Sequence, residues 1–115
     1  MNYLHLILIV LIGIFPLVSV GGENDPVPIF SFADTSCGAW TKSQQDESMR
    51  QIYLYWFRGF VSGYNLGSET KQVPMNAMPD QDTLSLYVDK YCREHPLLPF
   101  IGAAFQLVKE LSVKK

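Results

Sequence analysis

Histidine is scarce in this sequence, which contains only His5 and His95. Most activated nucleophiles and many metal sites require an imidazole. A zinc site needs three or four ligands at workable spacings, and Asp89, Glu94 and His95 alone do not supply them. His95 precedes a proline and is expected to be a solvent-facing loop residue. We therefore expect no metal, no cofactor and no catalytic residue.

The common catalytic motifs are also missing. Ser62, in the run of residues 59–63, stands one place too late for the Gly-x-Ser-x-Gly pattern of a nucleophile elbow, and there is no phosphate-binding loop. Two acid pairs stand at predicted helix starts: Asp46 with Glu47, and Asp80 with Asp82. Capping and the helix dipole explain these pairs better than general acid-base catalysis does. The sequence predicts a protein that is not an enzyme.

Neither sign of charge dominates the chain. Eleven acids face nine bases, and the formal net charge is −2. Nucleic acids and anionic membrane surfaces attract proteins through a strong positive field, which this composition does not provide. The charge balance excludes these two classes of partner and names no other.

No acid, lysine or arginine precedes Glu23, and this first stretch is apolar from Leu6 to Val18 apart from Gly13 and Pro16. Its length is typical of a secretion signal and short for a membrane span. Small residues suit cleavage in two registers: Ser19 with Gly21, or Val20 with Gly22. Residues 1–21 are predicted to be a cleaved signal peptide that directs the chain to the periplasm. Because the start lacks lysine and arginine, an uncleaved amino-terminal anchor is the alternative.

The chain contains two cysteines, Cys37 and Cys92. In an oxidising compartment they are expected to form one disulfide, with two separate buried thiols as the alternative. A cross-link over this span is worth about 4 kcal/mol in the chain-entropy account. That gain matters for a domain with a modest core.

Hydrophobic spacing predicts an all-α fold: a small four-helix, disulfide-stapled domain over residues 35–115, preceded by an extended arm over 22–34. Thr35 or Ser36 is expected to cap a short first helix that carries Cys37 and Trp40. A third helix begins at Asp80 or Asp82, and a fourth runs from Leu97 with Lys114 and Lys115 at its carboxyl end. These three elements surround one longer helix.

The long helix is predicted over 46–65. Its apolar stripe consists of Met49, Ile52, Tyr53, Trp56, Phe57, Phe60, Val61 and Tyr64. Arg50 and Arg58 fall off this stripe. Gly59 and Gly63 are expected to allow close approach of another element, since glycine in a helix costs about 1 kcal/mol unless packing offsets it. Asn65 and Gly67 are expected to end the helix as left-handed caps.

Three polar or aromatic residues remain outside this stripe: Tyr55, Arg58 and Asn65. With the Pro-containing loop at 66–79 they are predicted to form a contact for another protein, because loops beside rigid helices often carry binding residues. A solvated helix face is the alternative for each of them.

The placed helices carry three informative segments: Cys37-Gly38-Ala39-Trp40, residues 56–65, and residues 90–96. The cysteine positions resemble those of the HdeA/HdeB periplasmic acid-stress chaperones. The Gly-Phe-x-x-Gly run in 59–63 and the Lys-Tyr-x-x-x-x-Pro run in 90–96 are similar to those of the Tai/Rap immunity proteins, which neutralise type VI secretion amidases. The chain departs from the immunity group in lacking cysteines on the long helix, and from the chaperones in lacking densely charged ends.

The resemblances imply two functions that share one class of partner, another protein. An immunity or inhibitor-type protein binds one toxin, whereas an HdeA-like chaperone opens in acid and binds many clients. No membrane contact is expected after signal cleavage.

Overall fold

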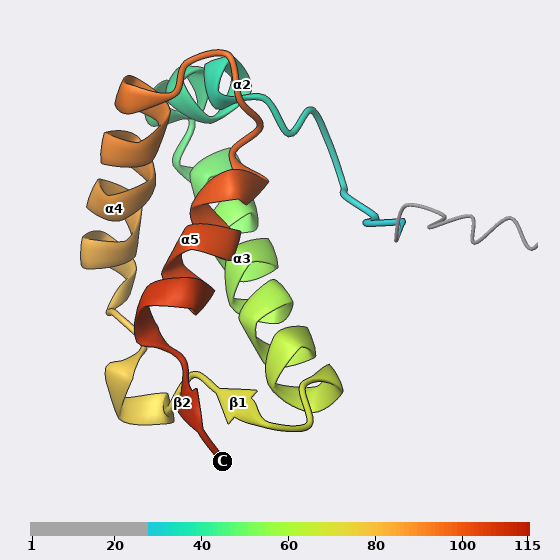
Figure 1. Ribbon diagram of the computed structural model, residues 1–115. Coiled ribbons are helices and arrows are strands. Elements are labelled where there is room, and N and C mark those ends of the chain that lie inside the picture. The colour runs from blue at the N-terminus through green and yellow to red at the C-terminus, as the bar shows by residue number, and fades with distance from the viewer. Residues whose placement is uncertain (1–27) are drawn as a thin grey trace, which may run out of the picture.

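The computed structural model describes residues 28–115, which form four α-helices and a two-stranded sheet (Figure 1). In chain order the elements are α2 (Cys37–Lys42), α3 (Glu47–Gly67), β1 (Lys71–Gln72), α4 (Gln81–Glu94), α5 (Ile101–Leu111) and β2 (Val113–Lys114). Short 3-10 turns cover Ser43–Gln45 and Met75–Ala77. The predicted helical fold is confirmed. The predicted signal peptide, residues 1–21, lies outside the described residues.

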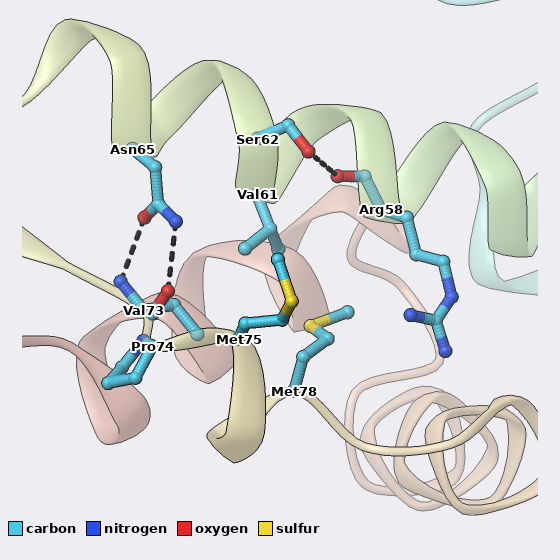
Figure 2. A pocket seen from close by; sticks show the side chains of 8 residues that line it. All are labelled: Arg58, Val61, Ser62, Asn65, Val73, Pro74, Met75 and Met78. Carbon is cyan, nitrogen blue, oxygen red and sulfur yellow. Dashed lines mark hydrogen bonds between the residues drawn. The ribbon is translucent and has the colours of Figure 1, made fainter.

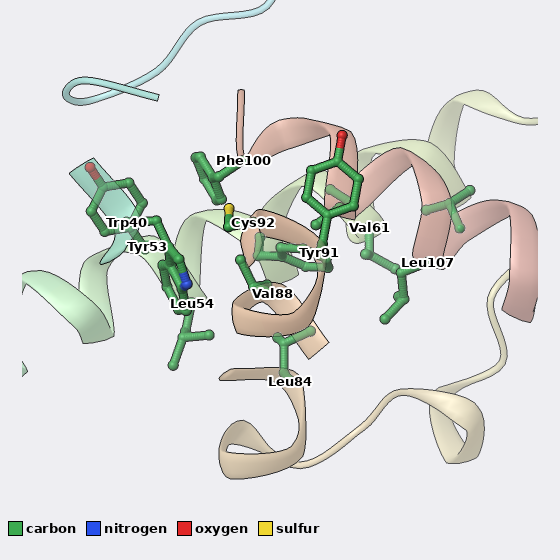
Figure 3. Packing of buried hydrophobic residues seen from close by; sticks show 14 of the residues in the cluster. Trp40, Tyr53, Leu54, Val61, Leu84, Val88, Tyr91, Cys92, Phe100 and Leu107 are labelled. Carbon is green, nitrogen blue, oxygen red and sulfur yellow. The ribbon is translucent and has the colours of Figure 1, made fainter. Parts of the chain in front are cut away.

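Helices α3, α4 and α5 lie along one another, and α2 closes one end of this group (Figure 1). Their shared core contains rings and aliphatic side chains from every helix (Figure 3). The largest fully buried side chains are Trp40, Phe57, Phe100, Leu84, Leu107 and Val88. Each such side chain removed from water stabilises the fold by roughly 1.5–3 kcal/mol before entropy is counted. The core accounts for the mutual placement of the four helices.

Three of the four helices, α2, α3 and α4, begin with a side-chain cap, whereas α5 has none. Ser36 Oγ accepts from the Ala39 backbone N–H at 3.0 Å and begins α2. Asp46 Oδ1 accepts from the N–H of residue 49 at 3.1 Å, and Asp80 Oδ1 from the N–H of residue 83 at 2.9 Å. Such caps satisfy donors that the first helical turn leaves unpaired. The capping interpretation of Ser36, Asp46 and Asp80 is confirmed.

The predicted disulfide joins Cys37 of α2 to Cys92 of α4, with their α-carbons 5.1 Å apart. Both cysteines are buried. Backbone hydrogen bonds tie the same end of the molecule to the segment before α5, from Cys37 N to Leu98 O at 3.3 Å and from Phe100 N to Thr35 O at 2.7 Å. The segment at 97–100 is thus used to hold α2, and the fourth helix begins at Ile101 rather than at the predicted Leu97.

The buried side of α3 is rotated from the predicted stripe. Leu54 and Arg50 are buried, whereas Ile52 is 43% exposed. Trp56 and Phe60, expected in the core, are half-buried. The placement of Arg50 off the buried face is wrong. The apolar stripe is wider than the surface that the other helices cover, so its spacing alone does not locate the centre of the contact.

Helix α3 ends without a left-handed residue. No glycine or other residue within 28–115 has a positive φ, so the predicted caps at Asn65 and Gly67 are wrong. Instead, the Lys115 ammonium donates to Asn65 O at 2.9 Å and also to Ser68 O. A cation at these carbonyls satisfies free acceptors and suits the negative end of the helix dipole. A distant lysine thus replaces the local cap.

The last residues form β2, which pairs antiparallel with β1 through Lys71 opposite Lys114. Lys115 N also donates to Thr70 O at 2.9 Å. The prediction that Lys114 and Lys115 complete the fourth helix is therefore wrong, because α5 ends at Leu111. Strands of two residues are too short to show alternation, so the sequence offered no sign of this sheet.

Glycine has a packing role at Gly102, where an added β-carbon would lie 2.6 Å from Cζ of Tyr91. The α4 ring rests directly on the α5 backbone at this point. Gly59 and Gly63, for which we predicted such an approach, have no neighbour from residues 28–115 within 4 Å of an added β-carbon. The prediction is therefore wrong for the described part of the chain.

The arm before α2 packs the ring of one of its two phenylalanines against the domain. In the arm, Phe32 packs edge-on against Tyr53 with ring centroids 5.0 Å apart, whereas Phe30 is 84% exposed. Among residues 28–115, no helix is long and apolar enough to cross a membrane.

Candidate functional site

The structure brings together two of the three predicted contact residues. Arg58 and Asn65 both point from α3 toward the loop at 66–79 and line one recess there (Figure 2). Tyr55 is 64% exposed and does not line that recess. The predicted contact therefore divides into a loop-facing pair and a separate aromatic side chain.

Asn65 clamps the loop to α3. Its Nδ2 donates to Val73 O at 2.9 Å, and its Oδ1 accepts from Val73 N at 2.8 Å (Figure 2). One side-chain amide thus satisfies both backbone groups of a residue whose side chain is buried. The clamp fixes the middle of the loop in a single register.

Arg58 holds the far end of the same loop. Its Nη2 donates to Pro79 O at 2.8 Å, one residue before the Asp80 cap of α4. Its Nε and Nη1 donate to no acceptor within residues 28–115. The guanidinium is therefore anchored at one nitrogen and has free donors at two.

Between these two anchors lies a recess of about 250 Å³. It is lined by Arg58, Val61, Ser62, Asn65, Val73, Pro74, Met75 and Met78. Figure 2 shows the side chains of Met75 and Met78 facing Val61 across it. Met75 is 94% exposed, so this recess opens beside an apolar side chain that nothing in the described chain covers. We call residues 66–79 together with Arg58 the loop face.

A second apolar surface follows the outer side of α3. Its groove, of about 510 Å³, is lined by Pro28, Ile29, Phe30, Trp56, Gly59, Phe60, Gly63 and Tyr64. Trp56 Nε1 donates to Phe30 O at 3.2 Å, and Phe60 stacks on Trp56 with centroids 5.6 Å apart. Gly59 and Gly63 lie between these aromatic side chains, and we call this surface the outer groove.

Sequence reasoning missed a polar cluster around Arg50. Its Nη2 pairs with Asp89 Oδ1 at 2.6 Å, and its guanidinium lies 3.6 Å above the Trp40 ring. Trp40 Nε1 donates to the same carboxylate oxygen at 2.8 Å, and Arg50 Nη1 donates to Trp40 O at 3.0 Å. Desolvated ion pairs of this kind are stable when further hydrogen bonds satisfy both partners. The available signal was spacing, because residue 50 shares a helical face with 53 and 54.

The titratable groups with altered pKa values have structural explanations. Burial between α4 and α5, together with nearby Glu110, raises the pKa of Tyr87. Backbone and side-chain hydrogen bonds from Ser36 lower the pKa of Asp34, and those from Thr83 lower the pKa of Asp80. His95 is exposed, as expected.

Within residues 28–115, no group of three or more histidine, cysteine, aspartate or glutamate side chains is placed to hold a metal ion. Of the four acidic side chains considered above as pairs, Asp46 and Asp80 are helix caps, and Glu47 and Asp82 lie in the first turns of the same helices.

Comparison with known proteins names no family. No family model matches the chain, and neither a characterised protein nor a solved structure matches it. The resemblances to the HdeA/HdeB chaperones and the Tai/Rap immunity proteins stay predictions from short motifs.

Proposed function

We propose that this chain is an exported protein, without turnover of its own, that binds one other protein through the loop face. The observation that carries the proposal is a loop that is held by hydrogen bonds to α3 while its apolar side chain Met75 is exposed to solvent. Asn65 and Arg58 fix the loop by backbone hydrogen bonds, while Met75 is 94% exposed at the rim of the recess. A surface ordered before binding loses little conformational entropy on association.

The exposed apolar side chains at this end support the proposal. Leu66, at the end of α3, is 88% exposed and Met75 is 94% exposed. Methionine is common at protein-binding surfaces because its unbranched thioether adapts to the partner's shape. Contact centres of such interfaces are enriched in tryptophan, tyrosine and arginine, and Arg58 would take such a position.

Export is the second part of the proposal. A disulfide is typical of proteins that fold in oxidising compartments, and the Cys37–Cys92 bond fits that setting. The predicted signal peptide at 1–21 and a periplasmic location complete this part. Intact-mass measurement of protein from the native host tests it, since a mature chain that starts at Met1 would contradict signal cleavage.

Within this class we favour an inhibitor of the immunity type, in which a folded protein binds one toxin. An acid-stress chaperone is the second candidate, and the outer groove favours it. Phe30 lines that groove and Phe105 packs against Phe60 at its edge, and both are more than half exposed. Tyr55, one helical turn before Gly59, is also more than half exposed. An uncharged aromatic surface of this kind suits many unfolded clients and selects none.

Affinity capture from periplasmic extract distinguishes the two candidates. Wild-type protein is immobilised at neutral and at acid pH, and its captured proteins are identified and then purified. The variants are Met75→Gln, which changes a side chain outside the core, and Tyr55→Ala on the other surface. Leu86→Gln is the matched control, because Leu86 is 69% exposed on α4 away from both surfaces.

One saturable partner at neutral pH, weakened at least tenfold by Met75→Gln and unaffected by Leu86→Gln, is the expected result. Many partners bound in acid and none at neutral pH would instead favour the chaperone. A single partner lost only with Tyr55→Ala would move the contact to the outer groove.

A further inference from the structure

We propose that the recess of the loop face binds a protein segment in which a large apolar side chain stands next to a carboxylate. The inference rests on the proposed function and deepens it by naming the chemistry of the partner. Two observations carry it: most residues that line the recess are apolar, and its charged group is a cation whose Nε and Nη1 have no acceptor within residues 28–115.

The apolar part of the argument comes from the walls. Five of the eight lining residues are apolar: Val61, Val73, Pro74, Met75 and Met78. A volume of about 250 Å³ is too small for a drug-sized molecule but holds one large side chain. Because the Asn65 clamp fixes Val73 and the backbone beside it, the recess exists before a partner arrives. An apolar side chain would displace weakly held water from it.

The charged part of the argument comes from Arg58. It is the one charged residue among the eight that line the recess. Its Nε and Nη1 have no acceptor within residues 28–115, while Nη2 is held by Pro79 O. Nη2 has a second hydrogen, which together with the hydrogen of Nε or of Nη1 forms a planar edge of two donors, the geometry that a carboxylate accepts.

No acidic side chain within residues 28–115 forms an ion pair with this cation. Asp80 follows Pro79 directly, but its two oxygens accept from the N–H and the hydroxyl of Thr83. The ion pair found in the described residues joins Arg50 to Asp89, in a different part of the molecule. Arg58 is therefore free of a bound carboxylate within residues 28–115 and can donate to one from a partner, which a basic segment does not offer.

Selection from a random peptide library displayed on phage tests the proposal without knowledge of the natural partner. The full mature chain is the target, as wild type and as Arg58→Gln, Met75→Ser and the control Leu86→Ser. We expect wild type and the control to enrich peptides with leucine, methionine or phenylalanine beside aspartate or glutamate. Arg58→Gln should lose the acidic preference, and Met75→Ser should lose the apolar one.

A double-mutant cycle on one enriched peptide then measures the pairing. Replacing its acid by the matching amide should weaken binding to wild type about tenfold, the scale of a charge-assisted hydrogen bond. The same replacement should make no difference with Arg58→Gln. Thermal unfolding of Arg58→Gln, which also loses the Pro79 bond, checks that the target stays folded.

Three results would overturn the inference: no enrichment, enrichment without an acidic residue, or an acid effect that persists in Arg58→Gln. If a natural partner still depends on Met75 in any of these cases, the proposed function stands and only the assigned chemistry fails. If neither the partner nor the peptides depend on Met75, both fail.

Discussion

The two ends of α3 are held by different means. At its amino-terminal end, the disulfide and the Arg50–Asp89 ion pair join α2, α3 and α4 in a buried setting. At its carboxyl-terminal end, the loop is held by the Asn65 clamp, by Lys115 and by a two-residue sheet, all close to solvent. The first end contains covalent and desolvated contacts, whereas the second contains hydrogen bonds that water can replace.

The contrast means that the contacts which stabilise the fold most strongly lie at one end of α3, whereas the loop face lies at the other end. Contacts that are buried and cross-linked determine the free energy of unfolding, while surface hydrogen bonds set only the local order of a segment. A protein built in this way tolerates changes at the loop face with little loss of fold. Four predictions test the contrast, from the largest expected effect to the smallest.

The largest effect is expected from the cross-link. The bond closes a sequence separation of 55 residues, and the chain-entropy account assigns such a loop about 4 kcal/mol. Replacing Cys37 and Cys92 by serine should lower the free energy of unfolding by this order, measured by urea unfolding. Reduction of wild type should produce the same loss, and a change below about 1 kcal/mol would show that other contacts hold this end.

The second effect concerns the polar cluster. Asp89→Ala leaves the buried Arg50 guanidinium and the Trp40 indole without their acceptor, which should cost about 3 kcal/mol. Asp89→Asn keeps an acceptor and should cost less. The Arg50→Met, Asp89→Leu double variant should be more stable than Asp89→Ala alone, because no charge is left unpaired. If the double variant were no more stable than Asp89→Ala, the unpaired buried charge would not be the cause of the lost stability.

The third effect belongs to the other end. Asn65→Ala removes both hydrogen bonds to Val73 and should cost about 2 kcal/mol, since two backbone groups of a buried residue lose their partner. Amide exchange should rise at Val73 and in β1 while the amides of α2 and α4 keep their protection. Equal loss of protection at both ends would contradict the separation. Leu66→Ala, at an exposed neighbour, is the control.

The smallest effect concerns acid. Because hydrogen bonds from Thr83 hold the pKa of Asp80 below its ordinary 3.8, the carboxylate contributes stability above that pH. This contribution is lost as pH falls through the lower folded value. Asp80→Asn should therefore flatten the pH dependence of stability below about pH 4. An unchanged slope would show that Asp80 is not one of the groups that couple folding to acid.

The features that the sequence predicted correctly depend on residues that are close to one another along the chain. Caps such as Asp80 involve contacts three residues apart, and helical spacing extends over a few turns. The disulfide was also predictable, because two cysteines in an oxidising compartment allow one intramolecular pairing.

The missed features depend on contacts between distant residues. Arg50 meets Asp89 39 residues away, and Lys115 reaches the carbonyl of Asn65 50 residues away. Neither pairing leaves a periodic trace, because each involves single residues on different elements. The function of Asn65 was missed for the same reason, since its type suited a cap or a contact equally well. Its two bonds to the loop became visible only once Val73 was placed.

The Lys115 contact has a mechanical consequence. It closes the span from Asn65 to Lys115, which overlaps the disulfide span from Cys37 to Cys92. Both closures include the segment from Asn65 to Cys92, so the loop face is attached to the rest of the domain by two separate contacts. A force applied at Met75 by a departing partner would pass through α4 to the disulfide and along β2 to Lys115. The disulfide is covalent, whereas Lys115 is held by hydrogen bonds, so the hydrogen bonds of Lys115 would break before the disulfide.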